Sequence, residues 1–137
     1  MLSKKQQDLN LGFSNEKLIF NKLRSLPYCD DLELISGYSI IDGKGKFAEL
    51  ELKTRRNIKH NQYPTGIIGV NKINEFKKNG KDHNYVVWKY DDGLFYLKHD
   101  DATFSKFAKE IQRVWRDGKC ELSECYYVPY EYMNKLE

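Results

Sequence analysis

The sequence has few cysteines and no long apolar run. The cysteines are Cys29, Cys120 and Cys125, an odd number without Cys-x-x-Cys spacing, so both a disulfide framework and a zinc site are disfavoured. Residues 1–8 lack the apolar stretch of a signal peptide, and no later apolar run is long enough to cross a membrane. We therefore expect an intracellular protein with reduced thiols and no membrane partner.

The chain also lacks a large excess of charge of one sign. Its 23 Lys and Arg against 20 Asp and Glu give a net charge of +3, which permits nucleic acid as a partner without requiring it. With 40% hydrophobic and 31% charged residues, the composition is that of a globular chain. At 137 residues, without an internal repeat or linker, we expect a single domain spanning residues 1–137.

Helical periodicity occurs in three segments. The first begins near Ser14 or Asn15, either of which can cap it, and ends at Pro27. The second covers residues 70–79 and the third residues 100–117. The apolar stripe of the third segment consists of Phe104, Phe107, Ala108, Ile111, Val114 and Trp115.

Strand patterns lie between these helices. They cover residues 32–42 (as one strand or two), 47–55, 84–90, 94–97 and 124–128. Gly43 to Gly45 predicts the turn before the second strand, and Asp92-Gly93 predicts a hairpin between the third and fourth. The helix over 70–79 is then a crossover connection, so the strand over 47–55 should be central and covered on both faces.

Alternation along the strand over 47–55 separates two kinds of side chain. Glu49, Glu51 and Lys53 share one face, because successive residues of a strand point in opposite directions. The opposite face carries the apolar residues Ala48, Leu50 and Leu52. Unpaired charged groups on a covered strand are costly, so acids buried there usually have a function. The alternative is a solvent-facing strand whose charges only confer solubility.

These residue types suit phosphodiester hydrolysis, which needs a positioned water and neutralisation of charge on the phosphate. We expect Asp42, at the end of the preceding strand, and Glu51 to bind Mg²⁺ or Mn²⁺ together with the backbone carbonyl of Leu52. Lys53 would then orient or polarise the attacking water. Glu49 is either a spare ligand or an outward residue at the start of the strand, and we favour the outward position.

Two further residues have two interpretations each. Glu16 lies beside the apolar face of the first helix, where it either reaches the site or only favours the helix dipole. Lys72, early in the second helix, either contacts a phosphate or is a plain surface lysine.

Basic residues surround the same strand. Arg55 and Arg56 follow it, and we expect Lys44, Lys46, Lys59 and His60 to flank the same end, forming a patch for the nucleic-acid backbone. The aromatic residues of the hairpin are Tyr85, Trp88, Tyr90, Phe95 and Tyr96. They can stack on bases or form a dimer interface, although core packing is expected for at least half of them.

The combination of Asp42 with Glu51-x-Lys53, preceded by Glu16 in a helix, resembles the PD-(D/E)XK nuclease superfamily. Glu51-Leu-Lys-Thr-Arg55, then Tyr63-Pro-Thr65 and Lys72, is similar to its small Holliday-junction-resolvase-like members from phages and large DNA viruses. Tyr127-Val-Pro129 also fits that group. The resemblance covers most of the chain, and Ile41 stands where many members have proline.

The resemblance implies an α/β (α+β) fold, a restriction-endonuclease-like core with a central mixed sheet flanked by helices. It implies a Mg²⁺- or Mn²⁺-dependent endonuclease acting in DNA repair, recombination or genome processing, and often a homodimer. Asp42 and Glu51 would be metal ligands, Lys53 the catalytic lysine and Glu16 the acid completing the site. A viral protein of this kind would act in the cytoplasm or nucleus of its host cell.

Substrate choice does not follow from the resemblance, because one core serves many substrates. Junctions, flaps and duplexes of DNA all remain open, as does RNA. One alternative function is a non-catalytic nucleic-acid-binding module with a nuclease fold. Another is an interaction domain that uses its aromatic hairpin.

Overall fold

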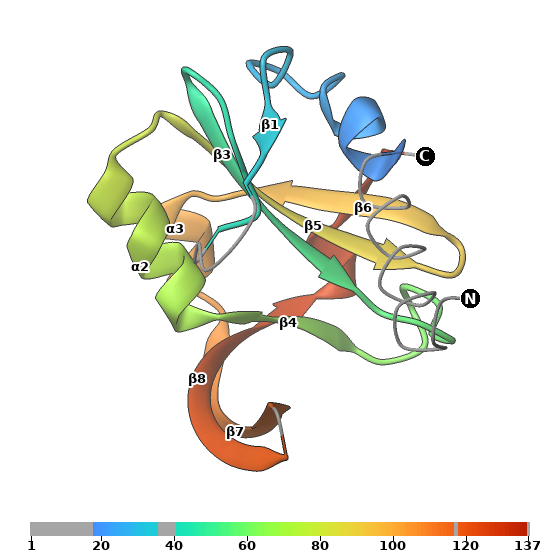
Figure 1. The fold of residues 1–137 in the computed structure, drawn as a ribbon. Coiled ribbons are helices and arrows are strands. Elements are labelled where there is room, and N and C mark those ends of the chain that lie inside the picture. The colour runs from blue at the N-terminus through green and yellow to red at the C-terminus, as the bar shows by residue number, and fades with distance from the viewer. Residues whose placement is uncertain (1–17, 36–40, 117, 137) are drawn as a thin grey trace, which may run out of the picture.

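The computed structural model describes residues 18–35, 41–116 and 118–136 (Figure 1). A helix over 18–23 comes first. The following elements are β1 (Glu33–Leu34), β2 (Gly43–Lys44), β3 (Ala48–Thr54), β4 (Thr65–Gly69), α2 (Val70–Asn79), β5 (His83–Tyr90), β6 (Gly93–Lys98), α3 (Asp101–Phe104), β7 (Ala108–Arg116), β8 (Lys119–Pro129), a 3-10 turn (Tyr130–Tyr132) and β9 (Asn134–Lys135). The fold is mixed α+β, as predicted.

Within these residues, a six-stranded sheet has the order β1-β2-β3-β5-β6-β9. β3 and β5 are parallel, and every other neighbouring pair is antiparallel. The parallel pair is joined through α2, which confirms the predicted crossover. β3 is an interior strand, so its backbone is hydrogen-bonded on both sides.

Both faces of this sheet are covered. On one face, Leu50 packs in a cluster with Phe20 and Leu23 from the N-terminal helix. On the other face, Ile73 and Phe76 of α2 join a second cluster that includes residues of β5, β6 and β8. Gly80 ends α2 in the left-handed conformation, φ 69°, with its N–H donating to the carbonyl of Phe76.

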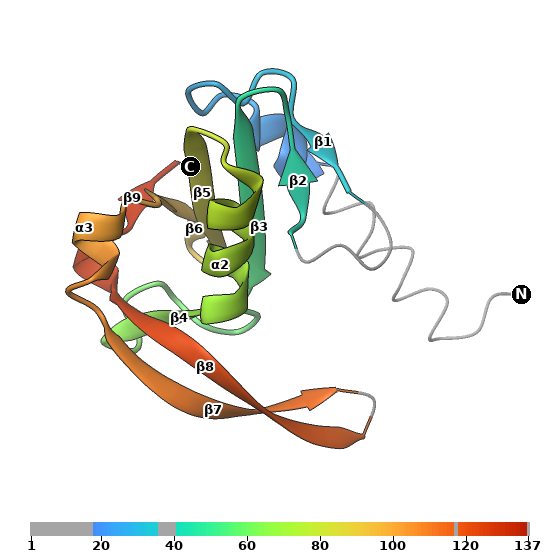
Figure 2. The ribbon, with the colours of Figure 1, turned by 90° about the vertical axis from the view of Figure 1, so that its left-hand side faces the viewer.

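A second sheet, of three strands, has the order β4-β8-β7. It approaches the first sheet closely at Gly66, where an added Cβ would lie 2.7 Å from the Tyr90 hydroxyl and 2.6 Å from Met133. The indole N–H of Trp88 donates to the carbonyl of Ile67 at 3.2 Å across the same junction. Beyond it, β7 and β8 continue as a two-stranded ribbon that projects from the rest of the molecule (Figures 1 and 2).

The predicted helix over residues 100–117 is wrong. Asp100 does cap a helix, through its side chain and the N–H groups of Ala102 and Thr103, but α3 ends at Phe104. Phe104 is buried in the core, whereas Ile111 is 66% exposed and lies in β7. β-branched and aromatic residues after Ala108 favour a strand. Pairing with β8 provides hydrogen-bond partners for the backbone of β7.

The remaining predictions of strands are largely confirmed. β3, β5 and β6 match the segments over 47–55, 84–90 and 94–97, and residues 124–128 lie inside β8. The turn predicted at Gly43 to Gly45 lies slightly later, because Gly43 and Lys44 pair with β3 as β2. β4 and β9 were not predicted as strands. In the described part of the chain, no helix is long and apolar enough to span a membrane.

Candidate active site

The carboxylates of Asp42 and Glu51 meet where β2 runs antiparallel to β3. Gly43 of β2 lies opposite Leu50 of β3. Because the two strands are antiparallel, the residue before Gly43, which is Asp42, lies beside the residue after Leu50, which is Glu51. The backbone N–H of Asp42 donates to the carbonyl of Leu50 at 3.1 Å, and the N–H of Leu52 donates to Asp42 Oδ2 at 2.8 Å. These bonds hold the Asp42 side chain against β3.

Glu51 is a carboxyl in an unfavourable environment for negative charge. It is only 5% exposed, and burial raises its pKa to about 8, with repulsion from Asp42 adding to the effect. Lys72 at the start of α2 partly offsets this, since its Nζ lies 3.4 Å from Glu51 Oε1. Glu51 Oε2 is buried and has no hydrogen-bond partner among the described residues. The site therefore favours additional positive charge.

Lys53 lies on the same face of β3, two residues further along, and is half-buried. Burial lowers the pKa of its ammonium group, and the charges of Arg55 and Lys72 lower it further, whereas Glu51 opposes the shift. A lysine of this kind gives up its proton more readily than an exposed lysine. The structure thus brings together Asp42, Glu51, Lys53 and Lys72, all of them predicted site residues. Glu16 lies outside the described residues.

The prediction that Glu49 points outward is wrong. Its side chain is 1% exposed, and the Asn79 amide donates to its Oε2 at 2.8 Å, while Oε1 is buried without a partner among the described residues. The alternation that placed Glu49 beside Glu51 already contained this information. The first four residues of β3 are all buried, so Glu49 at its start is as buried as Glu51 at its centre.

The basic residues lie at both ends of β3. The prediction that all of them lie at one end is wrong for Lys44 and Lys46. Lys44 pairs with Glu49, and Lys46 lies in the turn before β3, whereas Arg55 follows its far end. The seven residues of β3 span roughly 20 Å between these ends. An antiparallel hairpin necessarily places the residues of its turn at the start of the second strand. Arg56 is exposed beyond the far end.

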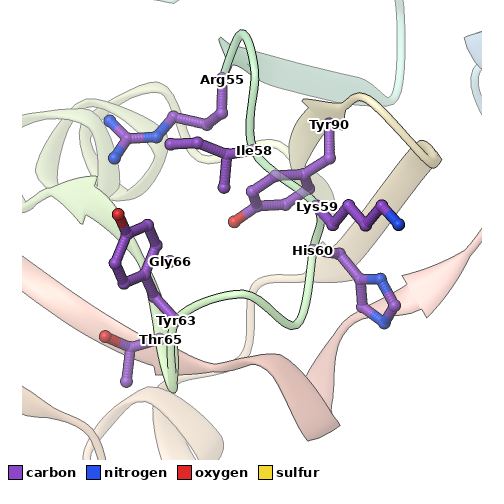
Figure 3. Close-up of a pocket in the computed structure, with 8 residues that line it drawn as sticks. All are labelled: Arg55, Ile58, Lys59, His60, Tyr63, Thr65, Gly66 and Tyr90. Atoms are coloured by element: carbon purple, nitrogen blue, oxygen red, sulfur yellow. The ribbon is translucent and has the colours of Figure 1, made fainter.

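A small pocket lies at the far end (Figure 3). Its lining residues are Arg55, Ile58, Lys59, His60, Tyr63, Thr65, Gly66 and Tyr90. Arg55 and the hydroxyl groups of Tyr63 and Tyr90 surround it, whereas Lys59 and His60 point away. His60 instead pairs with Asp92, Nδ1 to Oδ2 at 2.5 Å, and stacks on Phe95. Arg55 is thus the basic side chain best placed for a phosphate next to the carboxylates.

One feature near the site was not predicted, and one prediction about the hairpin is confirmed. Cys125 of β8 is 4% exposed and close enough to Lys53 to influence its charge, a contact that depends on how the two sheets pack. Four of the five hairpin aromatics, Tyr85, Trp88, Tyr90 and Phe95, are buried, which confirms core packing as their main role. No sequence pattern links residue 125 to residue 53.

The comparisons give no independent identification. Neither a family model, nor a curated protein, nor a solved structure matches the chain. Within residues 18–35, 41–116 and 118–136, no group of three or more His, Cys, Asp and Glu side chains is arranged to hold a metal ion. Asp42 and Glu51 supply two carboxylates, with Lys72 in contact with Glu51.

Proposed function

We propose that this protein is a metal-dependent endonuclease that hydrolyses phosphodiester bonds of DNA. The observation that carries the proposal is a pair of carboxylates, the buried Glu51 and the half-buried Asp42, beside the half-buried Lys53 and Lys72. Burying Glu51 and partly withdrawing three further charged groups from water at the same place has a cost for folding. The arrangement is better explained as a site for a divalent cation and a phosphate.

The chemistry of the donors fits Mg²⁺ or Mn²⁺. Carboxylate oxygens are the ligands these ions prefer, and Glu51 Oε2 is buried without a partner among the described residues. Asp42, Glu51 and the carbonyl of Leu52 would hold the ion. A bound ion would neutralise charge on the phosphate and favour ionisation of a water molecule.

Lys53 is placed to orient or polarise the attacking water, because it shares the face of β3 that carries Glu51. Burial lowers the pKa of its ammonium group below that of an ordinary lysine. Lys72 contacts Glu51 and holds a positive charge where the substrate phosphate would approach. Arg55 would bind a neighbouring phosphate, and Lys44, Lys46 and Arg56 more distant ones.

The contact between Lys72 and Glu51 also supports a second candidate, a nucleic-acid-binding module without turnover. An ammonium group 3.4 Å from the carboxylate partly neutralises it without any metal ion. In that case the basic residues would bind the nucleic-acid backbone and the carboxylates would have only a structural role.

Cleavage of labelled four-way junction, flap, single-stranded and duplex DNA distinguishes the two candidates. Each substrate is incubated with Mg²⁺, Mn²⁺ or chelator, for the native protein, Lys53→Ala and the exposed control Lys106→Ala. We expect metal-dependent cutting by the native protein and the control, and a loss of at least about a hundredfold in Lys53→Ala. Binding without cutting under every condition would favour the binding module.

The oligomeric state bears on the same experiment. Symmetric cutting of a four-way junction requires two active sites, so a homodimer is proposed for that substrate. Light scattering on the junction complex measures the number of chains. A monomer that makes a single cut would instead indicate a flap or another asymmetric substrate.

A further inference from the structure

Three aromatic rings meet at the surface where β5 begins. The ring of Tyr28 stacks on the ring of His83, with centroids 3.7 Å apart and planes 9° from parallel. The ring of Phe47, the residue before β3, lies edge-on to that of Tyr28, with centroids 6.4 Å apart. Tyr28, Phe47 and His83 form the aromatic cluster. None of the three takes part in the proposed hydrolysis.

The aromatic cluster exposes much of its ring surface. Tyr28 is 56% exposed and Phe47 is 48% exposed, although phenylalanine in particular is usually buried. His83 covers one face of the Tyr28 ring, so an exposure of this size leaves the other face open to solvent. The open face of a ring is a surface on which a further planar group can stack.

The backbone holds Tyr28 in this position at a cost. Its φ is 65°, in the left-handed region that residues other than glycine rarely adopt. The chain is fixed on both sides, because the Tyr85 hydroxyl donates to the carbonyl of Pro27 at 3.0 Å and Cys29 is 0% exposed. A glycine would adopt this backbone more easily, so the ring is what a tyrosine adds here.

Two lysine side chains contact the other rings of the cluster. Lys46 Nζ lies 5.2 Å from the centre of the Phe47 ring. The Lys98 ammonium donates to His83 Nδ1 at 2.7 Å, and this bond holds the imidazole beneath Tyr28. Both lysines are exposed. Stacking rings beside cationic side chains are the combination by which proteins bind single-stranded nucleic acids.

The charge balance favours a single strand over a duplex. The acids Asp30, Asp31 and Asp82 lie in the same segments as the rings, and Asp31 accepts from the backbone N–H of Lys46 at 2.8 Å. The lysines therefore do not form the large excess of positive charge that binding to duplex phosphates requires. A duplex also keeps its base faces stacked internally, whereas a single strand offers them to aromatic side chains.

We propose that the aromatic cluster binds an unpaired base of single-stranded DNA on the open face of Tyr28. Phe47 supplies a second ring beside the base, and Lys46 and Lys98 contact the flanking phosphates. Because a stacked base is recognised by its face, the cluster accepts any of the four bases.

The aromatic cluster lies apart from the carboxylate pair. His83 is paired with Ala48, whose side chain packs on the face of the sheet opposite Glu51. Phe47 precedes β3, and roughly 13 Å of strand separate it from Glu51. The cluster would thus hold a single-stranded segment at a distance from the cut, as in a flap or an open junction. The inference rests on the proposed DNA substrate but not on turnover.

Binding in chelator tests the inference, because cleavage then plays no part. Fluorescence anisotropy gives Kd for labelled oligothymidine and for an abasic strand of equal length, which keeps the phosphates but has no bases. The proteins are the native chain, Tyr28→Gly and the control Tyr132→Ala, which removes another exposed tyrosine. We expect the native chain and the control to bind oligothymidine about tenfold more tightly than the abasic strand, and Tyr28→Gly to lose this difference.

Equal affinity of the native chain for the two strands overturns the proposal, as does a difference that survives in Tyr28→Gly. Phe47→Ala provides a second variant in case Tyr28→Gly does not fold. It should weaken oligothymidine binding by about fivefold and leave abasic binding unchanged, and unchanged oligothymidine binding would also overturn the proposal.

The two proposals fail separately. Cleavage together with base-independent binding removes only the role of the aromatic cluster. Base-dependent binding without cleavage under any metal condition removes only the nuclease.

Discussion

β3 and the ribbon of β7 and β8 are opposite in what they bury. β3 buries two acids, with Glu49 1% and Glu51 5% exposed, whereas the ribbon leaves Ile111 66% and Leu122 71% exposed. Both segments are strands with mixed polar and apolar residues. The difference shows that position within the fold, and not polarity, decides burial here. Charged groups kept in a covered strand against their solvation cost are the stronger indication of function.

The largest expected effect concerns the acid at the centre of β3. Glu51→Gln should reduce metal-dependent cleavage by roughly a hundred- to thousandfold, because one of the two carboxylates is lost. The same variant should be more stable than the native protein in chelator at pH 9, by a few kcal/mol, since Gln buries no charge. Thermal unfolding at pH 5 and pH 9 measures this.

The sign follows from the raised pKa of Glu51. Between its unfolded pKa near 4.5 and its folded value of about 8, the folded state holds a proton that the unfolded state has lost, so stability falls as pH rises through this window. The advantage of Glu51→Gln should therefore grow from pH 5 to pH 9. An advantage that does not change with pH would show that Glu51 is not the group responsible.

The apolar face of β3 gives the next largest effect. Leu50→Ala should destabilise the fold by about 2–5 kcal/mol, because Leu50 is 0% exposed and packs against Phe20 and Leu23. Urea unfolding followed by circular dichroism measures it. A loss below about 1 kcal/mol would mean that the N-terminal helix does not pack on this face as described.

Metal affinity should depend on pH with a moderate slope. Because Glu51 must lose its proton to bind a cation and burial raises its pKa to about 8, affinity for Mg²⁺ should rise about tenfold per pH unit below pH 8 and level off above it. Isothermal titration calorimetry at pH 6, 7, 8 and 9 measures this. An affinity that is constant over the range would exclude Glu51 as a ligand.

The ribbon should show the smallest effect on stability. Leu122→Ala should change the free energy of unfolding by no more than about 0.5 kcal/mol, because the side chain is largely in solvent. It is the matched control for Leu50→Ala, since both delete the same atoms from a strand. A loss comparable with that of Leu50→Ala would show that another surface covers the ribbon in solution.

Much of the fold around the site could be predicted from local patterns. Period-two alternation placed Glu51 and Lys53 on one face of a strand, and the crossover helix over residues 70–79 made that strand interior. Asp92-Gly93 located the hairpin of β5 and β6. These predictions succeeded because each depends on backbone geometry within a few residues.

Other features depended on partners distant in sequence. The apolar period after Asp100 suits a helix, but pairing of β7 with β8 gave those residues a strand conformation. Lys44 and Lys46 were placed at the wrong end of β3, although the predicted turn over residues 43–45 already puts them at its start, as the pairing of β2 with β3 shows. Register and sheet order are set by long-range packing and do not appear in local periodicity.

By itself, the sequence determined which charged side chains lie together: Asp42, Glu51 and Lys53 follow from strand alternation and one turn. Only the tertiary structure decided how strongly their charges are perturbed, because burial by α2 and the second sheet removes water from them. It also decided that Glu49 is buried with one oxygen that has no partner in the described part of the chain, and that Lys72 contacts Glu51. Desolvation depends on everything packed around a group, and no local stretch of sequence contains that information.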